Sequence, residues 1–263
     1  MGGNPPDQAR SGAFTQSARV PVLDVNVTPL TRDQLLSSVA TAIGGGRRLT
    51  IAGHNLHSVY LTRTDAQFRR FYEDAELRLI DGMPLLSALD LTALCGGRPR
   101  WGSRHRLGST DWIPQVMHLP SVRRIVLFGA SEASNRQAVQ TLGERAEQTE
   151  LLGIPADPWN PEDLDAVAAQ IRAFGPQLLL IGMGMPLQER LAAALRACTS
   201  VAVIATVGGA IDQLSGTQSL APRWIGRTGL EWAWRLASDP RRFAGRYLVE
   251  PFQLARLILR GAA

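Results

Sequence analysis

Residues 180–189 read Leu-Ile-Gly-Met-Gly-Met-Pro-Leu-Gln-Glu, an apolar run that breaks into glycines and a proline before a polar pair. Residues 206–212 follow the same plan as Thr-Val-Gly-Gly-Ala-Ile-Asp. A strand that ends in glycines and leads into a helix presents backbone N–H groups to anions. The two segments therefore predict strand-to-helix turns that bind an anionic ligand, with phosphate as the first candidate.

The rest of the chain alternates strand and helix patterns. Helical patterns begin after Thr31, where Gln34 completes a capping box, and after Asn160, where proline occupies the first helical position. Apolar strand patterns occupy residues 20–27, 49–52, 77–80, 124–129, 178–181 and 201–205. This alternation predicts an α/β fold, a Rossmann-like parallel sheet with helices on both faces. Ligands of such sheets bind at the carboxyl ends of the strands.

Length and composition favour one large domain with an appendage. We expect a flexible tail over residues 1–19, an α/β domain over 20–222 and a basic helical appendage over 223–263. The cysteines, Cys95 and Cys198, lie far apart, which fits a reducing cytosol and predicts neither a disulfide framework nor a metal site. No apolar run has a membrane-spanning length, and the polar start does not resemble a secretory signal.

The charge is concentrated at the end of the chain. All 28 basic residues are arginine, which genome composition can explain. Residues 223–263 hold eight arginines and three acids, so this segment alone carries the net charge of +5. Such a tail predicts an anionic partner, a nucleotide diphosphate or anionic lipid, rather than nucleic acid, for which no motif is present. Its interleaved Arg and apolar residues, divided by Pro251, are typical of an interfacial helix, or of a tail packed on its own domain.

Two polar residues follow predicted strands. Asp81, in the Asp-Gly pair after residues 77–80, is positioned to act as a general base, although Asp-Gly is also a common turn. Asn55 can orient a sugar hydroxyl or simply cap the next helix. His54 and His57 flank it, but two histidines make a weak metal site. Asp163 and Asp165 form an Asp-x-Asp pair inside a predicted helix, which does not suit a metal site. Arginines and N–H groups can stabilise a departing diphosphate instead.

Together these segments resemble the glycosyltransferases of the WecG/TagA/CpsF type, glycosyltransferase family 26, over about residues 20–250. The matching motifs occur in one order: Asn55-Leu56, Asp81–Pro84, Gly182–Glu189, Val207–Asp212, Ala221–Trp224, Gly229–Trp232, Arg235, Pro240–Arg242 and Arg246-Tyr247. The number of motifs in this order makes the resemblance specific.

The resemblance implies an inverting, metal-independent enzyme without cofactors. It would transfer a sugar, N-acetylmannosamine or a related one, from a UDP-sugar to a polyprenyl-diphosphate-linked saccharide in cell-surface or exopolysaccharide synthesis. It implies that Asp81 is the catalytic base. It also implies a cytoplasmic enzyme that binds peripherally to the anionic inner face of the membrane, as a monomer or a homo-oligomer. The substrate-binding residues would be Asn55, Gly82, Gly182, Gly184, Gln188, Glu189, Gly208, Gly209, Asp212, Arg235, Arg242 and Arg246. Each of the glycines can instead serve tight packing of strand against helix.

The chain departs from the family pattern in places. Gly53 stands where the family commonly has Thr, and Gly108-Ser-Thr-Asp111 is one residue longer than usual, after an insert with Arg98, Arg100, Arg104 and Arg106. A Gly-Tyr-Phe stretch is missing near Asp157. Two alternatives remain: a non-catalytic scaffold of polysaccharide assembly, and a nicotinamide-dependent oxidoreductase, whose Gly-x-Gly-x-x-Gly pattern Pro186 disrupts.

Overall fold

The structure, a computed structural model, describes residues 17–146, 148–218 and 231–261. Its strands are β1 (Ala18–Val20), β2 (Val25–Val27), β3 (Leu49–His54), β4 (Leu77–Ile80), β5 (Arg124–Gly129), β6 (Glu150–Ile154), β7 (Leu178–Gly182) and β8 (Val203–Thr206). Its helices up to Cys95 are α1 (Arg32–Gly44), α2 (Leu56–Thr64), α3 (Ala66–Asp74) and α4 (Met83–Cys95).

The later helices alternate with the remaining strands. They are α5 (Ser109–Val116), α6 (Glu132–Gly143), α7 (Leu164–Phe174), α8 (Leu187–Cys198) and α9 (Ala210–Ser215), with short 3₁₀ turns at Ser103–His105 and Pro161–Asp163. The C-terminal helices are α11 (Glu231–Ser238), α12 (Pro240–Ala244) and α13 (Glu250–Gly261), and a π-helical turn, Gly245–Val249, joins the last two.

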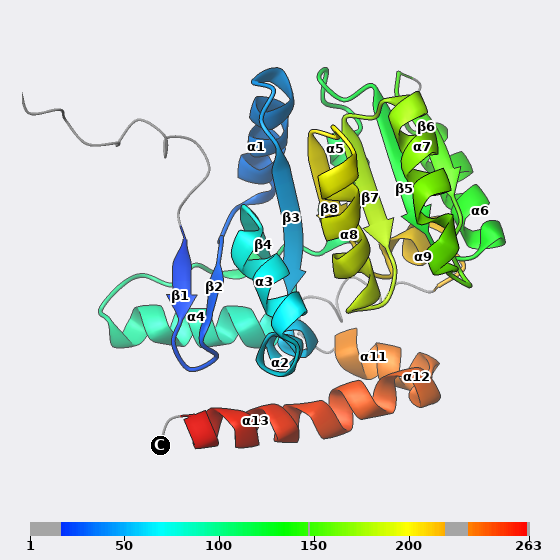
Figure 1. The fold of residues 1–263 in the computed structure, drawn as a ribbon. Coiled ribbons are helices and arrows are strands. Elements are labelled where there is room, and N and C mark those ends of the chain that lie inside the picture. The colour runs from blue at the N-terminus through cyan, green and yellow to red at the C-terminus, as the bar shows by residue number, and fades with distance from the viewer. Residues whose placement is uncertain (1–16, 147, 219–230, 262–263) are drawn as a thin grey trace, which may run out of the picture.

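The central sheet has six parallel strands in the order β4-β3-β8-β7-β5-β6 (Figure 1). The predicted parallel α/β sheet is therefore confirmed. The strands are mostly apolar because helices cover both faces of the sheet, and β7 is buried at every position. Inside the sheet, the second strand, β3, pairs with the third, β8, which comes much later in the chain.

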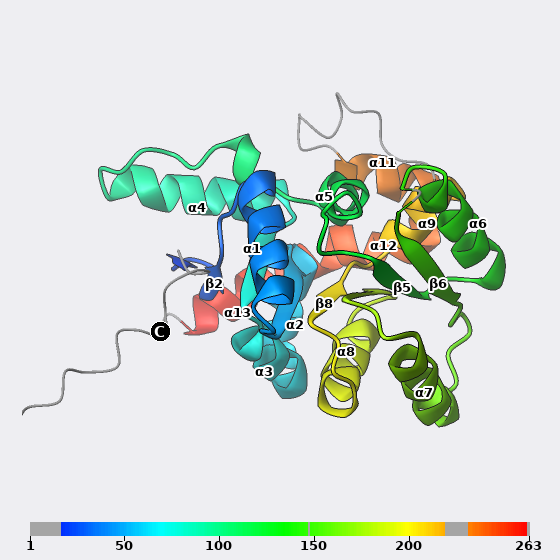
Figure 2. The same ribbon diagram turned by 90° about the horizontal axis from the view of Figure 1, so that it is seen from above.

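Each face of the sheet has its own apolar core. Seen from above (Figure 2), α1, α5, α6 and α9 lie on one face, and α3, α7 and α8 lie on the other. The first core contains Leu35, Trp112, Ile113 and Ile211, and the second contains Phe68 and residues of α7 and α8. Helices on both faces, as predicted from the alternating patterns, shield the sheet from water.

A third core lies beside the edge strand β4. It joins β1 and β2 with α2, α4 and α13, and it includes Val20, Leu85 and Leu254. Residues 20–27 are not one strand, as their alternation predicted, but the second half of an antiparallel hairpin whose turn holds Asp24 at φ 52°. Burial alternates only from Leu23 to Val27, and the turn places Val22 in solvent at 55% exposure.

The C-terminal helices lie across the carboxyl ends of the strands (Figure 1). The helices are separated at Asp239, between α11 and α12, and not at Pro251, where the backbone continues from the π-helical turn into α13 with Pro251 as its second residue. This placement brings the basic segment next to the strand ends.

Candidate active site

A cavity of about 950 Å³ opens at the carboxyl ends of β3, β4, β7 and β8. Asn55, Asp81, Gly184 and Gly208 line it from the loops after these strands. Its opposite wall comes from the C-terminal helices through Arg241, Phe243, Gly245, Arg246 and Glu250. The cavity therefore lies where parallel sheets bind ligands, between the sheet and the basic segment.

Asp81 and Asn55 meet because their strands are neighbours. In the parallel pair β3–β4, His54 lies opposite Ile80, so the next residues of both chains enter the cavity together. The Asn55 Nδ2 donates to Asp81 Oδ2 at 3.4 Å. Asn55 also caps α2, since its Oδ1 accepts from the Ser58 N–H at 3.1 Å. The two roles considered for Asn55 are thus compatible.

Backbone surrounds the Asp81 side chain closely. A Cβ added at Gly53 would lie 3.6 Å from Asp81 Cβ, and one at Gly108 would lie 3.3 Å from Asp81 Oδ1. Gly53 lines the cavity. The position where the family commonly carries Thr is therefore beside the carboxylate, with room for a small side chain.

Gln188 connects the turns after β7 and β8. Its Oε1 accepts from the Gly208 N–H at 2.9 Å and, at 3.5 Å, from the Met183 N–H. Its Nε2 donates to Glu189 Oε1 at 2.8 Å. Glu189 is completely buried, and this burial raises the pKa of its carboxyl to about 7. Gln188 lines the cavity, whereas Glu189 supports it from behind.

The glycines predicted to bind substrate divide into two groups. Gly184, Gly208 and Gly209 line the cavity, and Gly208 has φ +57°, a conformation that favours glycine. A Cβ at Gly182 would lie 2.7 Å from the Ile211 side chain, so Gly182 serves tight packing of β7 against α9.

Four of the predicted residues lie outside the described lining of this cavity. They are Gly82, which precedes α4, Gly182, Glu189 and Asp212. The Asp212 Oδ1 accepts from the Ser134 hydroxyl at 2.6 Å, which turns this carboxylate toward α6. Their assignment to substrate binding stays a prediction.

Arginines give the cavity its cationic character. Those among the described lining residues are Arg32, Arg106, Arg241 and Arg246. The carboxylates there are Asp81, Asp111 and Glu250, and Arg106 Nη2 lies 3.9 Å from Asp111 Oδ2. Guanidinium groups bind phosphate oxygens in a bidentate manner, which suits a diphosphate. Of the three arginines predicted for this role, Arg246 is present here, and the side chains of Arg235 and Arg242 lie outside the described part of the structure.

A hydrogen bond between His57 and Glu250 joins the C-terminal helices to the sheet domain at the cavity wall. His57 Nδ1, on α2, lies 2.6 Å from Glu250 Oε2, on the first turn of α13. Burial and the nearby Arg246 lower the pKa of His57, against the opposing effect of Glu250. His57 and Glu250 both line the cavity, so this contact helps position its C-terminal wall.

The neighbouring His54 has a structural environment. It is buried, its Nδ1 lies 2.9 Å from Ser58 Oγ, and burial and Arg78 lower its pKa to about 3. Among the described residues, no cluster of three or more His, Cys, Asp or Glu side chains could hold a metal ion.

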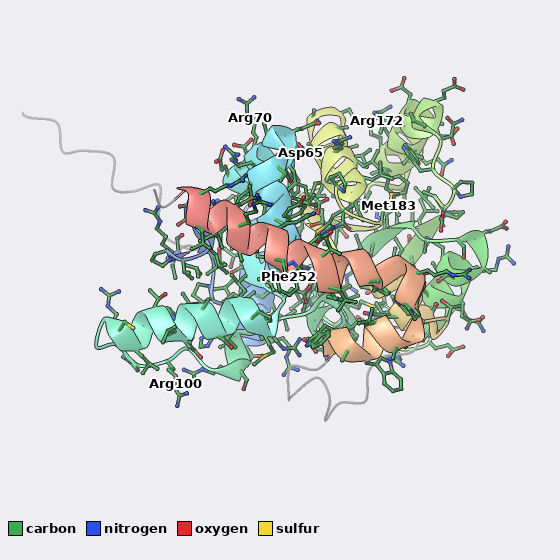
Figure 3. The ribbon with its side chains drawn as sticks, turned by 90° about the horizontal axis from the view of Figure 1, so that it is seen from below. Asp65, Arg70, Arg100, Arg172, Met183 and Phe252 are labelled. Carbon is green, nitrogen blue, oxygen red and sulfur yellow. The ribbon has the colours of Figure 1, made fainter. Side chains whose placement is uncertain are left out.

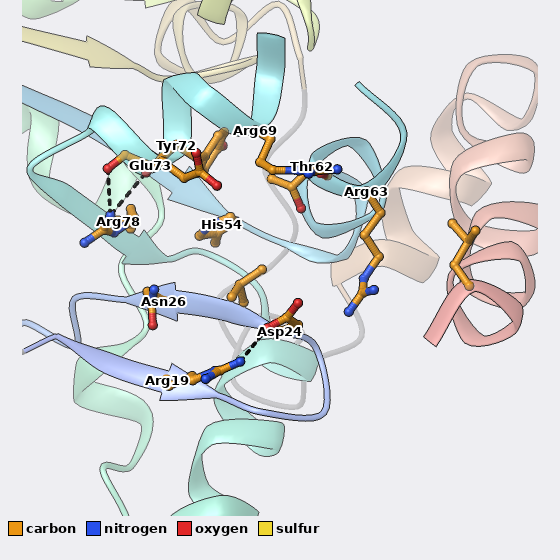
Figure 4. A pocket seen from close by; sticks show the side chains of 12 residues that line it. Arg19, Asp24, Asn26, His54, Thr62, Arg63, Arg69, Tyr72, Glu73 and Arg78 are labelled. Carbon is orange, nitrogen blue, oxygen red and sulfur yellow. Dashed lines mark hydrogen bonds and ion pairs between the residues drawn. The ribbon is translucent and has the colours of Figure 1, made fainter. Parts of the chain in front are cut away.

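A second cavity, of about 520 Å³, lies between the β1–β2 hairpin and helices α2 and α3 (Figure 4). Arg19, Arg63, Arg69 and Arg78 line it together with His54. These arginines already have partners in the protein: Arg78, for example, donates to the Tyr72 and Glu73 carbonyls at 3.2 and 3.3 Å. Of the predicted active-site residues whose side chains the structure describes, none lines this cavity.

Sequence reasoning missed several lining residues. Arg241 was within a matching motif, and Arg106 was within the arginine-rich insert, but neither was selected. Arg32 is the first residue of α1 and carried no signal beyond its charge. The polar residues Ser109, Thr110, Gln115, Gln213 and Gln218 also line the cavity. Which polar side chain of a helix faces a distant loop depends on tertiary packing.

The sequence was compared with known proteins. The family model described as "Glycosyl transferase WecG/TagA/CpsF family" matches residues 20–263. A curated relative from Bacillus subtilis (strain 168), named N-acetylglucosaminyldiphosphoundecaprenol N-acetyl-beta-D-mannosaminyltransferase, is 29% identical over 135 residues. This match covers 51% of the chain and 52% of the relative, so the chain spans about half of that relative's length. Within the described residues, no helix has the length and apolarity needed to cross a membrane.

Proposed function

This chain belongs to the WecG/TagA/CpsF family of glycosyl transferases, and we propose that it transfers N-acetylmannosamine or a related sugar from a UDP-sugar. The acceptor is a polyprenyl-diphosphate-linked saccharide, as the name of the Bacillus subtilis relative suggests for its own reaction. The observation that carries the proposal is the cavity itself. It holds Asp81 and Asn55 opposite Arg241 and Arg246, a carboxylate and cations on facing walls.

Asp81 acts as the general base in this proposal. Its carboxylate takes the proton from the acceptor hydroxyl as the oxygen attacks the anomeric carbon. The bond from that carbon to the UDP oxygen breaks on the opposite side, so the configuration at the carbon is inverted. Asn55, hydrogen-bonded to Asp81, orients the carboxylate or the acceptor.

The departing UDP leaves with negative charge on its diphosphate. Arg241 and Arg246 supply positive charge from the C-terminal wall, and the turns after β7 and β8 supply backbone N–H groups. The side chain of Gln188 holds these turns together. In this arrangement the arginines perform the task for which many transferases use a divalent cation.

We place the enzyme on the anionic inner face of the cytoplasmic membrane. The helix α13 packs Leu254 into the third core and exposes Phe252 and Leu259 on its other side (Figure 3). Arg256 and Arg260 are exposed on the same helix. An apolar face flanked by arginines is the pattern of a helix that lies in a membrane interface.

The direct test uses purified protein with a panel of UDP-sugars and a synthetic polyprenyl-diphosphate saccharide. We expect UDP release together with a mass increase of one sugar on the acceptor, read by mass spectrometry. A non-catalytic scaffold would bind the UDP-sugar or the acceptor without releasing UDP. An oxidoreductase would instead consume a nicotinamide cofactor. Either outcome would contradict the proposed transfer.

A further inference from the structure

We propose that the tip of α4 and the arginine segment after it, residues 91–104, form a second contact with the anionic bilayer surface, separate from α13. The inference rests on the proposed function, because it assumes an enzyme that works at a membrane. It concerns residues to which the proposed reaction assigns no role.

The outer stripe of α4 is apolar where the helix leaves the body of the protein. Leu85, Leu86 and Leu89 are buried in the third core. On the opposite side of the helix, Leu91 and Leu94 are 62% and 52% exposed. Exposing two leucines costs free energy in water, and a lipid interface removes that cost.

The segment after the helix carries positive charge alone. Residues 96–104 read Gly-Gly-Arg-Pro-Arg-Trp-Gly-Ser-Arg, with three arginines and no acid. Arg98, Arg100 and Arg104 are all exposed. Anionic headgroups attract arginines that lie near the bilayer surface. A second copy of the chain facing this tip would bring like charges together.

In this proposal the tip and the exposed face of α13 contact the same bilayer. α13 lies below α4 in Figure 1, and the view from below shows both helices, with Phe252 labelled on α13 and Arg100 beside α4 (Figure 3). Phe252 and Leu259 are 77% and 74% exposed. One helix on a flat surface leaves rotation about its axis free, whereas a second contact away from that axis fixes the orientation.

This orientation bears directly on the cavity. The helix α4 begins two residues after Asp81 and runs about 20 Å to its tip, at 1.5 Å per residue. With α4 and α13 both on the bilayer, the cavity is held near the level of the headgroups. A lipid-linked acceptor can then present its diphosphate and sugar to Asp81.

The test compares full-length variants on vesicles of 30% phosphatidylglycerol in phosphatidylcholine. We expect the double variant Leu91→Ser/Leu94→Ser to bind about tenfold more weakly in sedimentation, and Arg98→Gln/Arg100→Gln/Arg104→Gln to lose a comparable factor. A charge-matched control, Arg136→Gln/Arg145→Gln/Arg172→Gln, changes exposed arginines on or beside α6 and α7. This control should retain wild-type vesicle binding. Unchanged vesicle binding of both tip variants would overturn the inference.

A water-soluble, short-chain acceptor separates this inference from the proposed function. The tip variants should transfer sugar to it at the wild-type rate but lose activity on acceptor embedded in vesicles. Absence of transfer by wild-type protein would instead contradict the proposed function. If Leu91→Ser/Leu94→Ser converts a dimer to a monomer in analytical ultracentrifugation and binds vesicles normally, the tip is covered by a second copy and the lipid contact is wrong.

Discussion

The carboxylate of Asp81 is held at the cavity by the pairing of β3 with β4 and by the Asn55 amide. We expect Asp81→Asn to lower turnover by about 10²-fold or more, the usual contribution of a general base. Folding and UDP binding should stay near wild type, because asparagine has the same shape. Steady-state turnover and UDP titration measure both effects. Asp33→Asn, on the exposed side of α1, is the matched control, and near-wild-type turnover of Asp81→Asn would remove this residue from the mechanism.

The buried carboxyl of Glu189 makes stability depend on pH. In the folded protein the Glu189 carboxyl keeps its proton up to about pH 7, whereas in the unfolded chain the same carboxyl loses the proton near pH 4.5. Between these values the folded state binds more protons, so the free energy of unfolding falls as pH rises, by about 3 kcal/mol. Glu189→Gln should remove this fall. Denaturant unfolding of wild-type protein and Glu189→Gln at pH 5 and pH 8 measures this fall. If the free energy of unfolding changed equally with pH in both proteins, the raised pKa of Glu189 would be wrong.

The role of single residues was only partly predictable from the sequence. Asp81 and Asn55 were found because both follow strand patterns, and parallel strands end at one edge. Glu189 was predicted to line the cavity, but its side chain is buried behind Gln188. The sequence does not show this burial, because it depends on how α8 packs on the sheet. Arg241 was missed because the sequence does not show which side of a short helix faces the cavity.

At the scale of elements, the turn from β7 to α8 contains glycines with different tasks. A Cβ at Gly182 would lie 2.7 Å from the Ile211 side chain and 3.0 Å from the Gly208 carbonyl oxygen, whereas Gly184 has no atom within 4 Å of that position. Gly182→Ala should therefore lower the free energy of unfolding by about 1–3 kcal/mol through overpacking. Gly184→Ala should change it little. Urea unfolding of both variants tests the difference, and equal stabilities would mean that Ile211 simply moves aside.

Strands were predicted well where they are buried on both faces. The bounds of β4 and β5 match the apolar runs at 77–80 and 124–129. The capping box at Thr31 is present at the start of α1. The edge strand β6, Glu150–Ile154, was not predicted, because an exposed Glu150 and a central Gly153 weaken its strand pattern. The hairpin of β1 and β2 was read as one strand, since side-chain alternation does not reveal a tight turn.

At the scale of the whole molecule, the distribution of arginines predicts that the proposed reaction needs no added metal. Arg32, Arg106, Arg241 and Arg246 line one cavity and can balance the charge of UDP. We expect protein treated with EDTA to keep its turnover within about twofold. Assays with EDTA alone and with Mg²⁺ or Mn²⁺ restored measure this. Activity that returns only with added metal would count against the arginine-based mechanism.

Removal of the C-terminal helices tests their combined role. Among the described residues, the two cores on the faces of the sheet contain none after Ser219, whereas the third core loses Leu254, so a chain ending there should fold with lower stability. It lacks Arg241, Arg246 and the α13 face, and should lose most activity and most binding to anionic vesicles, with the α4 tip as the remaining contact. Circular dichroism, sedimentation and transfer assays measure the three properties. A folded, truncated protein that binds vesicles and transfers sugar normally would contradict this dual role.

The pairing of β3 with β8 also has a consequence for how the chain folds. Leu49 of β3 lies opposite Val203 of β8, so about 150 residues of chain separate these two paired strands. Closing so long a loop costs entropy before the new contacts return it, and pairings of this kind slow folding. The pairs β3–β4 and β5–β6 join strands much closer in sequence. We therefore expect the strand ends of β3 and β4 to meet those of β7 and β8 late in folding, so that the proposed nucleotide site is completed only after most helices have formed.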